Sequence, residues 1–131
     1  MIYVPYLAII AAFALVHVPR FVVGREMHKQ DGGYNNRDPR AQQASLEGLG
    51  RRALAAHNNG FEAFAPFAAG VLAAVQRGVR KEIVVGLCIA FVVVRSIYVA
   101  AYLADKSGAR SGMWTLGLLA TAGLMIFAVI G

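Results

Sequence analysis

Four apolar stretches of membrane-spanning length take up most of this chain. They cover residues 2–23, 53–75, 83–103 and 113–130. Each has roughly the 17 to 25 residues that an α-helix needs to cross a bilayer. Since 58% of the residues are hydrophobic, too little sequence remains for a separate soluble domain. The pattern predicts an all-α integral membrane protein with a single domain over residues 1–131, built as a four-helix bundle.

The expected helices lie at about residues 2–24, 44–76, 82–104 and 111–130, and a polar loop is expected at about 25–43. Turn-forming residues dominate this loop, and Pro39 disfavours helical geometry at Asp38. The first apolar stretch has no basic segment before it, unlike a cleaved signal peptide, so we expect it to stay in the protein. Cys88 is the only cysteine, which excludes an internal disulfide and a cysteine-based metal cluster. No metal site is predicted.

Basic residues are distributed unevenly among the loops. Six lie between the first and second apolar stretches, from Arg25 to Arg52, and Lys106 and Arg110 follow the third. Because an excess of Lys and Arg marks cytoplasmic loops, these two loops are predicted to face the cytoplasm, with both termini outside. We therefore expect a multi-pass protein of the inner or plasma membrane. The net charge of +6 is explained by topology, and nucleic-acid binding is not expected.

Polar side chains interrupt the second apolar stretch, where residues 51–67 read RRALAAHNNGFEAFAPF. Ionisable groups are costly at membrane depth and are usually functional there. At about 1.5 Å of rise per residue, Glu62 lies about 16 Å beyond Arg51. Arg95 lies at the same depth, counted back from Lys106. The two opposite charges are therefore predicted to meet in one layer.

Helical spacing places these polar residues on two facing stripes, at positions 52, 55, 59, 62 and 66 and at positions 88, 91, 95, 98 and 102. The stripes predict a polar cleft that opens to the cytoplasm. Arg, Asn and Tyr donate to carboxylates and Glu accepts from an ammonium group, so a small zwitterionic anion such as a peptide fits the cleft. The simpler alternative is that the same side chains only hold the helices together. His17 and His57 are interpreted as packing residues and not as haem ligands, because His57 falls about 200° around the helix from Asn59.

The polar segment resembles the signature of the MAPEG family, the membrane-associated proteins in eicosanoid and glutathione metabolism. The matching residues are Arg52, Asn59, Glu62 and Pro66. A second stretch of the sequence is also similar to this family, through Arg95, Tyr98, Tyr102, Arg110 and Ser111. Trp114 stands where the family often has a tyrosine.

The resemblance implies a homotrimer in the lipid bilayer, with glutathione as co-substrate bound between adjacent subunits near the cytoplasmic face. It implies that the peptide is bound by Arg52, Asn59, Glu62, Arg95, Tyr98 and Tyr102. Arg110 and Ser111 would be catalytic, since a cation beside the sulfur favours the nucleophilic thiolate.

We therefore expect a membrane-embedded glutathione-dependent transferase or peroxidase that acts on lipophilic electrophiles or hydroperoxides. The alternative is a non-enzymatic membrane trimer of the same family, whose polar residues serve assembly, lipid binding or partner binding. A small cation exporter is disfavoured, because such transporters place an acidic residue in their first helix and residues 2–23 contain none.

Overall fold

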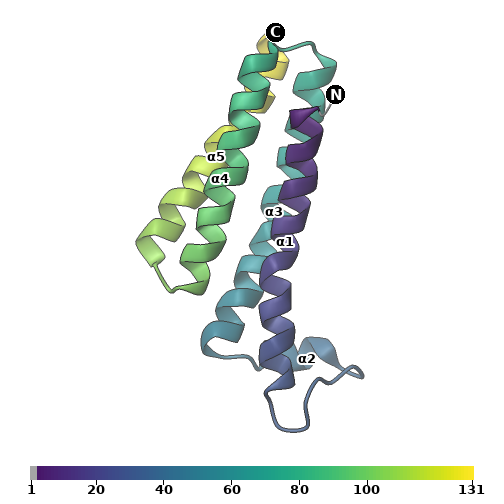
Figure 1. Cartoon of the computed structure of the whole chain (residues 1–131), viewed down its shortest axis with the longest axis vertical. Coiled ribbons are helices and arrows are strands. Elements are labelled where there is room, and N and C mark those ends of the chain that lie inside the picture. Colours follow the sequence, from purple (N-terminus) through teal and green to yellow (C-terminus); the bar gives the residue numbers. More distant parts are fainter. Residues whose placement is uncertain (1–2) are drawn as a thin grey trace.

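Every regular element in the computed structural model, which describes residues 3–131, is a helix. The helices are α1 (Val4–His28), α2 (Pro39–Ala44), α3 (Gly48–Gln76), α4 (Lys81–Leu103) and α5 (Ser107–Ile130). Four of them are long and run along the molecule, whereas the short α2 lies at one end (Figure 1). The all-α prediction is confirmed.

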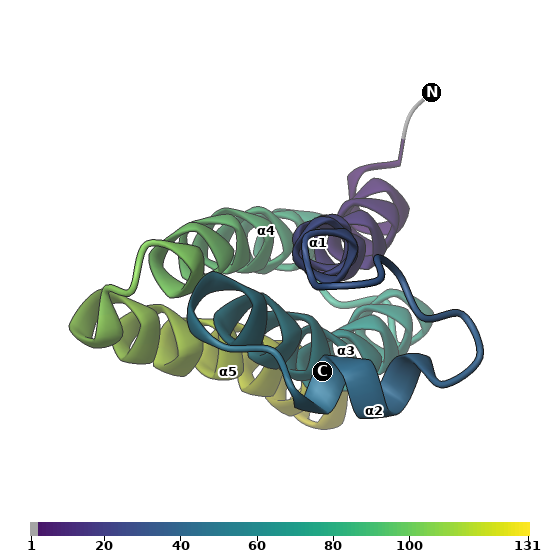
Figure 2. The same ribbon diagram turned by 90° about the horizontal axis from the view of Figure 1, so that it is seen from below.

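The long helices pack in two rows. Seen from below, α1 and α4 form one row and α3 and α5 form the other (Figure 2). The most extensive contacts are those of α1 with α3 and of α4 with α5. The shared core includes Leu124 and the rings of Phe67 and Phe91, which stack with 3.7 Å between their centroids. These packed rings hold α3 and α4 in register behind the polar residues.

Three helices in the described part of the chain, α1, α4 and α5, are long and apolar enough to cross a membrane. Helix α3 has 29 residues, but its polar residues lower its hydropathy, and it is not among the three. The prediction of four spans is thus supported for three helices. Phe21 on α1 and Val129 on α5 remain 78% and 80% exposed, as expected for side chains that face lipid.

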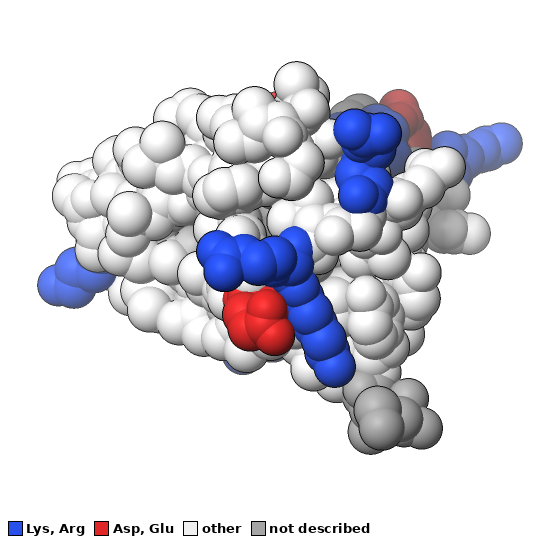
Figure 3. All heavy atoms as spheres, turned by 90° about the horizontal axis from the view of Figure 1, so that it is seen from above, with Lys and Arg blue, Asp and Glu red and all other residues white. Residues whose placement is uncertain are grey.

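The end of the molecule that holds the α3–α4 turn carries a small group of charges. Seen from this end, most of the surface is uncharged, with basic side chains around an acidic one (Figure 3). The turn and the start of α4 contribute Arg77, Arg80, Lys81 and Glu82. Nε of Arg77 donates to the carbonyl of Ala128 at 3.2 Å, which ties this turn to the end of α5.

The helix expected from about residue 44 to 76 begins at Gly48 in the structure, as α3, and the short α2 forms at the end of the loop expected at about residues 25–43. Helix α2 begins at Pro39, and the Asp38 side chain caps it by accepting from the amide of Ala41 at 3.3 Å. The chain then breaks at Glu47, which is extended, and at Gly48, whose φ of +52° suits glycine. The break buries Leu46 in a second core. Burial of this side chain is a tertiary effect that helical periodicity does not register.

Helix α5 begins at Ser107, earlier than the expected residue 111. Asp105 adopts a φ of +59°, and the amide of Lys106 donates to the carbonyl of Ala101 at 2.8 Å, which reverses the chain tightly after α4. As a result, Arg110 and Ser111 lie within the first turns of α5 and not at its first residue. Helix α1 likewise extends to His28, beyond the expected residue 24.

Candidate functional site

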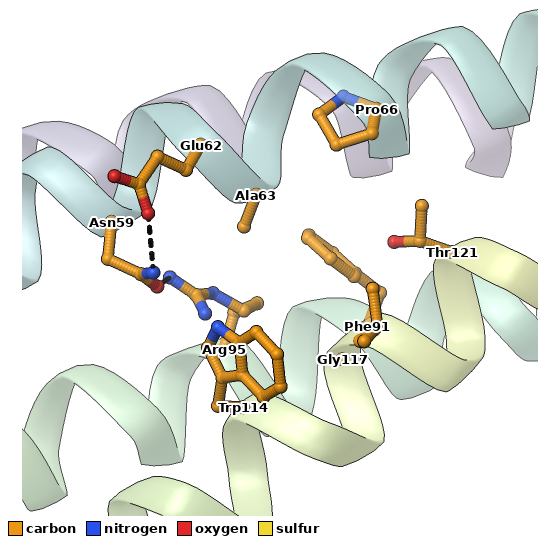
Figure 4. Close-up of a pocket in the computed structure, with 10 residues that line it drawn as sticks. Asn59, Glu62, Ala63, Pro66, Phe91, Arg95, Trp114, Gly117 and Thr121 are labelled. Carbon is orange, nitrogen blue, oxygen red and sulfur yellow. Dashed lines mark hydrogen bonds between the residues drawn. The ribbon is translucent and has the colours of Figure 1, made fainter.

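Asn59 joins the two charged residues that the sequence places in one layer. Nη2 of Arg95 donates to Oδ1 of Asn59 at 3.0 Å, and Nδ2 of Asn59 donates to Oε2 of Glu62 at 2.9 Å (Figure 4). Arg95 and Glu62 therefore lie in one layer of the helix bundle, but they are linked through an amide side chain. The ion pairs among residues 3–131 do not include this pair.

The two charges differ in burial. Arg95 on α4 is only 5% exposed, whereas Glu62 on α3 lies on the surface of the chain. Helix α5 covers Arg95 closely at Gly117, where a Cβ atom would lie 3.3 Å from Cδ of Arg95. Glycine at this position thus allows α5 to close over the guanidinium group.

Aromatic rings continue the network along α4. The guanidinium carbon of Arg95 lies 4.0 Å from the centroid of the Tyr98 ring, and that of Arg110 lies 4.6 Å from the Tyr102 ring. The Tyr98 and Tyr102 rings meet edge to face with centroids 5.6 Å apart. The spacing of 95, 98 and 102 keeps these side chains on one helix face. A row of donor groups therefore extends from Arg95 toward the α4–α5 turn.

Two cavities contain most of the candidate residues. An inner cavity of about 130 Å³ lies between α3, α4 and α5 and includes Asn59, Glu62 and Arg95. An outer cavity of about 240 Å³, next to the α4–α5 turn, is lined by Tyr98, Tyr102, Arg110, Ser111, Trp114 and Thr115. Trp114 lines both cavities. Seven of the eight predicted site residues thus line one of two cavities that share a wall.

Comparison with protein families bears directly on this arrangement. A family model described as the MAPEG family matches residues 3–130. The chain belongs to the MAPEG family. Comparison with curated proteins and with solved structures finds no match. Together with its apolar helices, membership identifies the chain as a membrane protein, and it fits a function related to glutathione in general terms.

Arg52, the remaining candidate, lies outside both cavities of this MAPEG chain. Its Nη2 donates to the carbonyl of Leu103 at 3.3 Å, and its Nη1 lies 3.9 Å from Oδ2 of Asp105. Its Nε is buried without a hydrogen-bond partner. Arg52 therefore joins α3 to the end of α4, and its role as a carboxylate ligand stays a prediction.

The two membrane-depth histidines of the MAPEG chain lie among aromatic rings. Nδ1 of His57 lies 2.7 Å from the carbonyl oxygen of Val16, and Nδ1 of His17 lies 2.9 Å from that of Phe13. Their rings are 6.0 Å apart, and both contact the edge or face of Phe61. Residues 3–131 contain no group of three or more His, Cys, Asp or Glu side chains that could hold a metal.

Sequence reasoning missed the contribution of α5 to the site. Trp114, Gly117 and Thr121 line the inner cavity. Together with Arg110 they follow a spacing of four, three and four residues, which is the rule that identified the stripes on the second and third apolar stretches. Applied to the fourth stretch of this MAPEG sequence, the same rule would have found a third stripe.

Proposed function

We propose that the chain is a membrane-embedded glutathione-dependent transferase or peroxidase, with lipophilic electrophiles or hydroperoxides arriving from the bilayer. The observation that supports this proposal is the continuous row from Glu62 through Asn59, Arg95, Tyr98 and Tyr102 to Arg110. The row combines one exposed acid with several donors and ends in a cation beside an open cavity. Glutathione offers two carboxylates, one ammonium group and one thiol, which match these groups in kind.

In this proposal the exposed carboxylate of Glu62 accepts from the ammonium group of the peptide. Asn59 donates to one of its oxygens and leaves the other available. The hydroxyl groups of Tyr98 and Tyr102 donate to the peptide and its carboxylates. Arg52, near the end of α4, is a further donor to a carboxylate. Arg95 contributes mainly by holding Asn59 in place.

Arg110 and Ser111 act at the sulfur. A guanidinium group next to a thiol stabilises the thiolate over the neutral form, and the thiolate is the nucleophile. The Ser111 hydroxyl, which lines the same cavity, donates a second hydrogen bond to the sulfur. In the transferase reaction the thiolate forms a bond to the electrophilic carbon, and the leaving group departs with its electron pair.

Assembly and orientation belong to the same proposal. Glu62 is exposed on the isolated chain, and at the membrane depth predicted from the sequence an uncovered carboxylate is unfavourable against lipid. A neighbouring protomer would cover it. We therefore propose a homotrimer that binds glutathione between subunits, with the loop after α1 and the α4–α5 turn on the cytoplasmic side.

Calorimetry on the purified protein in lipid nanodiscs tests the proposal. We expect saturable heat on titration with glutathione, competition by an S-alkylated analogue, and conjugation of an aryl halide. Absence of binding by a protein that remains assembled would overturn the glutathione function.

Two variants distinguish this function from a purely structural role of the polar residues. Glu62→Gln keeps the size of the side chain and the acceptor for Asn59, and Arg95→Leu removes the buried cation. If the residues bind a ligand, Glu62→Gln stays assembled and loses glutathione affinity. If they serve only assembly, both variants dissociate in light-scattering measurements, whereas glutathione affinity per assembled protein is retained.

A further inference from the structure

The inner cavity is apolar over most of its wall. Its sides are formed by Ala63, Pro66, Phe91, Gly117 and Leu118, from three helices. Glu62, Asn59 and Arg95 lie at one end, and Thr121 lies at the other (Figure 4). A peptide backbone would find few hydrogen-bond partners along these sides. These sides of the cavity are therefore better suited to an apolar group than to a peptide backbone.

The size of the cavity limits what it can hold. Its volume of about 130 Å³ is close to the roughly 150 Å³ of an apolar protein cavity that binds benzene. Phe91 forms one wall and is supported from behind by the Phe67 ring, with an interplanar angle of 3°. This flat wall is rigid, since Phe67 is fully buried. A single aromatic ring fits the space.

Thr121 adds a polar contact to this ring-sized space. The residue is 5% exposed, and among residues 3–131 no hydrogen bond to its hydroxyl group is formed, whereas the hydroxyl of Thr115 on the same helix donates to the carbonyl of Ser111 at 3.1 Å. Figure 4 shows the Thr121 oxygen on the side that faces Phe91 and the cavity. A hydroxyl group both donates and accepts hydrogen bonds, so this one is available to a polar substituent on the occupant.

Trp114 stands between this space and the proposed position of the sulfur. It lines the inner cavity together with Phe91 and the outer cavity together with Arg110. A group held against Phe91 would therefore have Trp114 between it and Arg110. The indole limits how far an occupant can extend toward the thiolate.

We infer that the inner cavity is a binding subsite for a compact single-ring aromatic compound that carries one hydrogen-bonding substituent. Phe91 contacts its ring, Thr121 binds its substituent, and Trp114 faces it on the side of Arg110. This inference rests on the proposed function in one respect only, which is that the bound ring is part of the electrophilic substrate. Binding of the ring itself requires neither glutathione nor turnover.

Trp114 reports on the subsite directly, because it is the only tryptophan in the chain. We would titrate the full-length protein in nanodiscs with 4-iodophenol, a single-ring heavy-atom quencher, and follow Trp114 fluorescence without glutathione. We expect a saturable component above the linear collisional quenching of an exposed indole. Thr121→Leu, which fills the cavity, should remove the saturable component, and Ala63→Leu should do so from the α3 side if Thr121→Leu fails to fold.

Matched changes test the hydrogen bond. Thr121→Val keeps the volume and removes the hydroxyl, so 4-iodophenol should bind about fivefold more weakly, the equivalent of one hydrogen bond. Binding of 4-iodotoluene should not change. The control Thr115→Val alters a threonine outside the inner cavity and should leave both probes unaffected.

The inference is overturned if 4-iodophenol quenches the unaltered protein without saturation, or if both cavity-filling variants retain the saturable component in a folded protein. Failure of the glutathione function is a separate result, since the titration contains no thiol. Where conjugation is observed, Thr121→Leu should raise KM for a single-ring electrophile at least fivefold and leave glutathione affinity unchanged.

Discussion

The guanidinium group of Arg95 reaches Glu62 only through Asn59. Arg95 donates to the oxygen of the amide at 3.0 Å, and the nitrogen of the amide donates to the carboxylate at 2.9 Å. This arrangement fixes the orientation of Asn59, since each end of its amide has a partner of opposite character. It also leaves Glu62 free of a direct ion pair. The acid therefore retains acceptor capacity for a cationic group from outside the protomer.

Replacing Asn59 should destabilise the protein more than its size suggests. Asn59→Leu removes the hydrogen-bond acceptor of Arg95, a residue that is only 5% exposed, and we expect a loss of about 1–3 kcal/mol in unfolding free energy. Denaturation in detergent monitored by circular dichroism measures this loss. The matched control is Asn58→Leu, since Asn58 is exposed. Equal effects of the two variants would contradict the assigned role of Asn59.

Gly117 should be required for the position of Arg95. In Gly117→Ala, the new methyl group lies 3.3 Å from Cδ of Arg95, so the arginine must shift or α5 must move outward. We expect glutathione affinity, measured by calorimetry, to fall several-fold because Asn59 is no longer held. Gly108→Ala, where a Cβ atom has no neighbour within 4 Å, should leave affinity unchanged. Unaltered binding by Gly117→Ala would show that the close approach has no function.

The contact between α1 and α3 depends on Gly60. A Cβ atom there would lie 3.2 Å from the backbone Cα of Val16, and a backbone atom cannot give way as a side chain can. We expect Gly60→Ala to lower the unfolding free energy by about 1–3 kcal/mol through overpacking. Gly86→Ala, in open space on α4, should be neutral or stabilising, since alanine favours helix. Thermal unfolding of the two variants provides the comparison, and a stable Gly60→Ala protein would be evidence against this packing.

Arg52 allows a direct test between two roles. As a connection to the carbonyl of Leu103 and to Asp105, it holds the turn that positions Arg110. Arg52→Leu should then accelerate amide hydrogen exchange at residues 104–107 and weaken glutathione binding indirectly. Arg51→Leu, a change at an exposed position, is the control. Lost glutathione affinity with unchanged exchange would instead identify Arg52 as a ligand of the peptide, as the sequence predicts.

The pH dependence of turnover should report on Arg110. The thiolate is the reactive form. At saturating glutathione, kcat/KM for the electrophile therefore rises with pH until the thiol of bound glutathione is ionised. Removing the cation in Arg110→Gln destabilises the thiolate and raises this pKa, so the plateau should move to higher pH and activity at neutral pH should fall, about tenfold for each unit of pKa. Arg110→Lys, which keeps the charge, should move the profile less. A change in KM alone, with the profile in place, would exclude thiolate stabilisation by Arg110.

The sequence by itself determined the helical class, the long apolar helices and the common layer of Glu62 and Arg95. Depth along a helix depends only on residue number, since the rise per residue is constant. The family resemblance is also visible in the sequence, because the residues that carry it lie in two short stretches of the chain.

Only the tertiary structure decided how these helices end and which faces meet. The break at Gly48 buries Leu46, the tight turn at Asp105 places Arg110 inside α5, and Arg52 joins α3 to the end of α4 and lines neither cavity. These features depend on contacts between distant segments and on the rotation of each helix about its axis. The same applies to the wall that α5 contributes through Trp114 and Thr121. Residue spacing groups these side chains on one face, but packing alone turns that face toward the site.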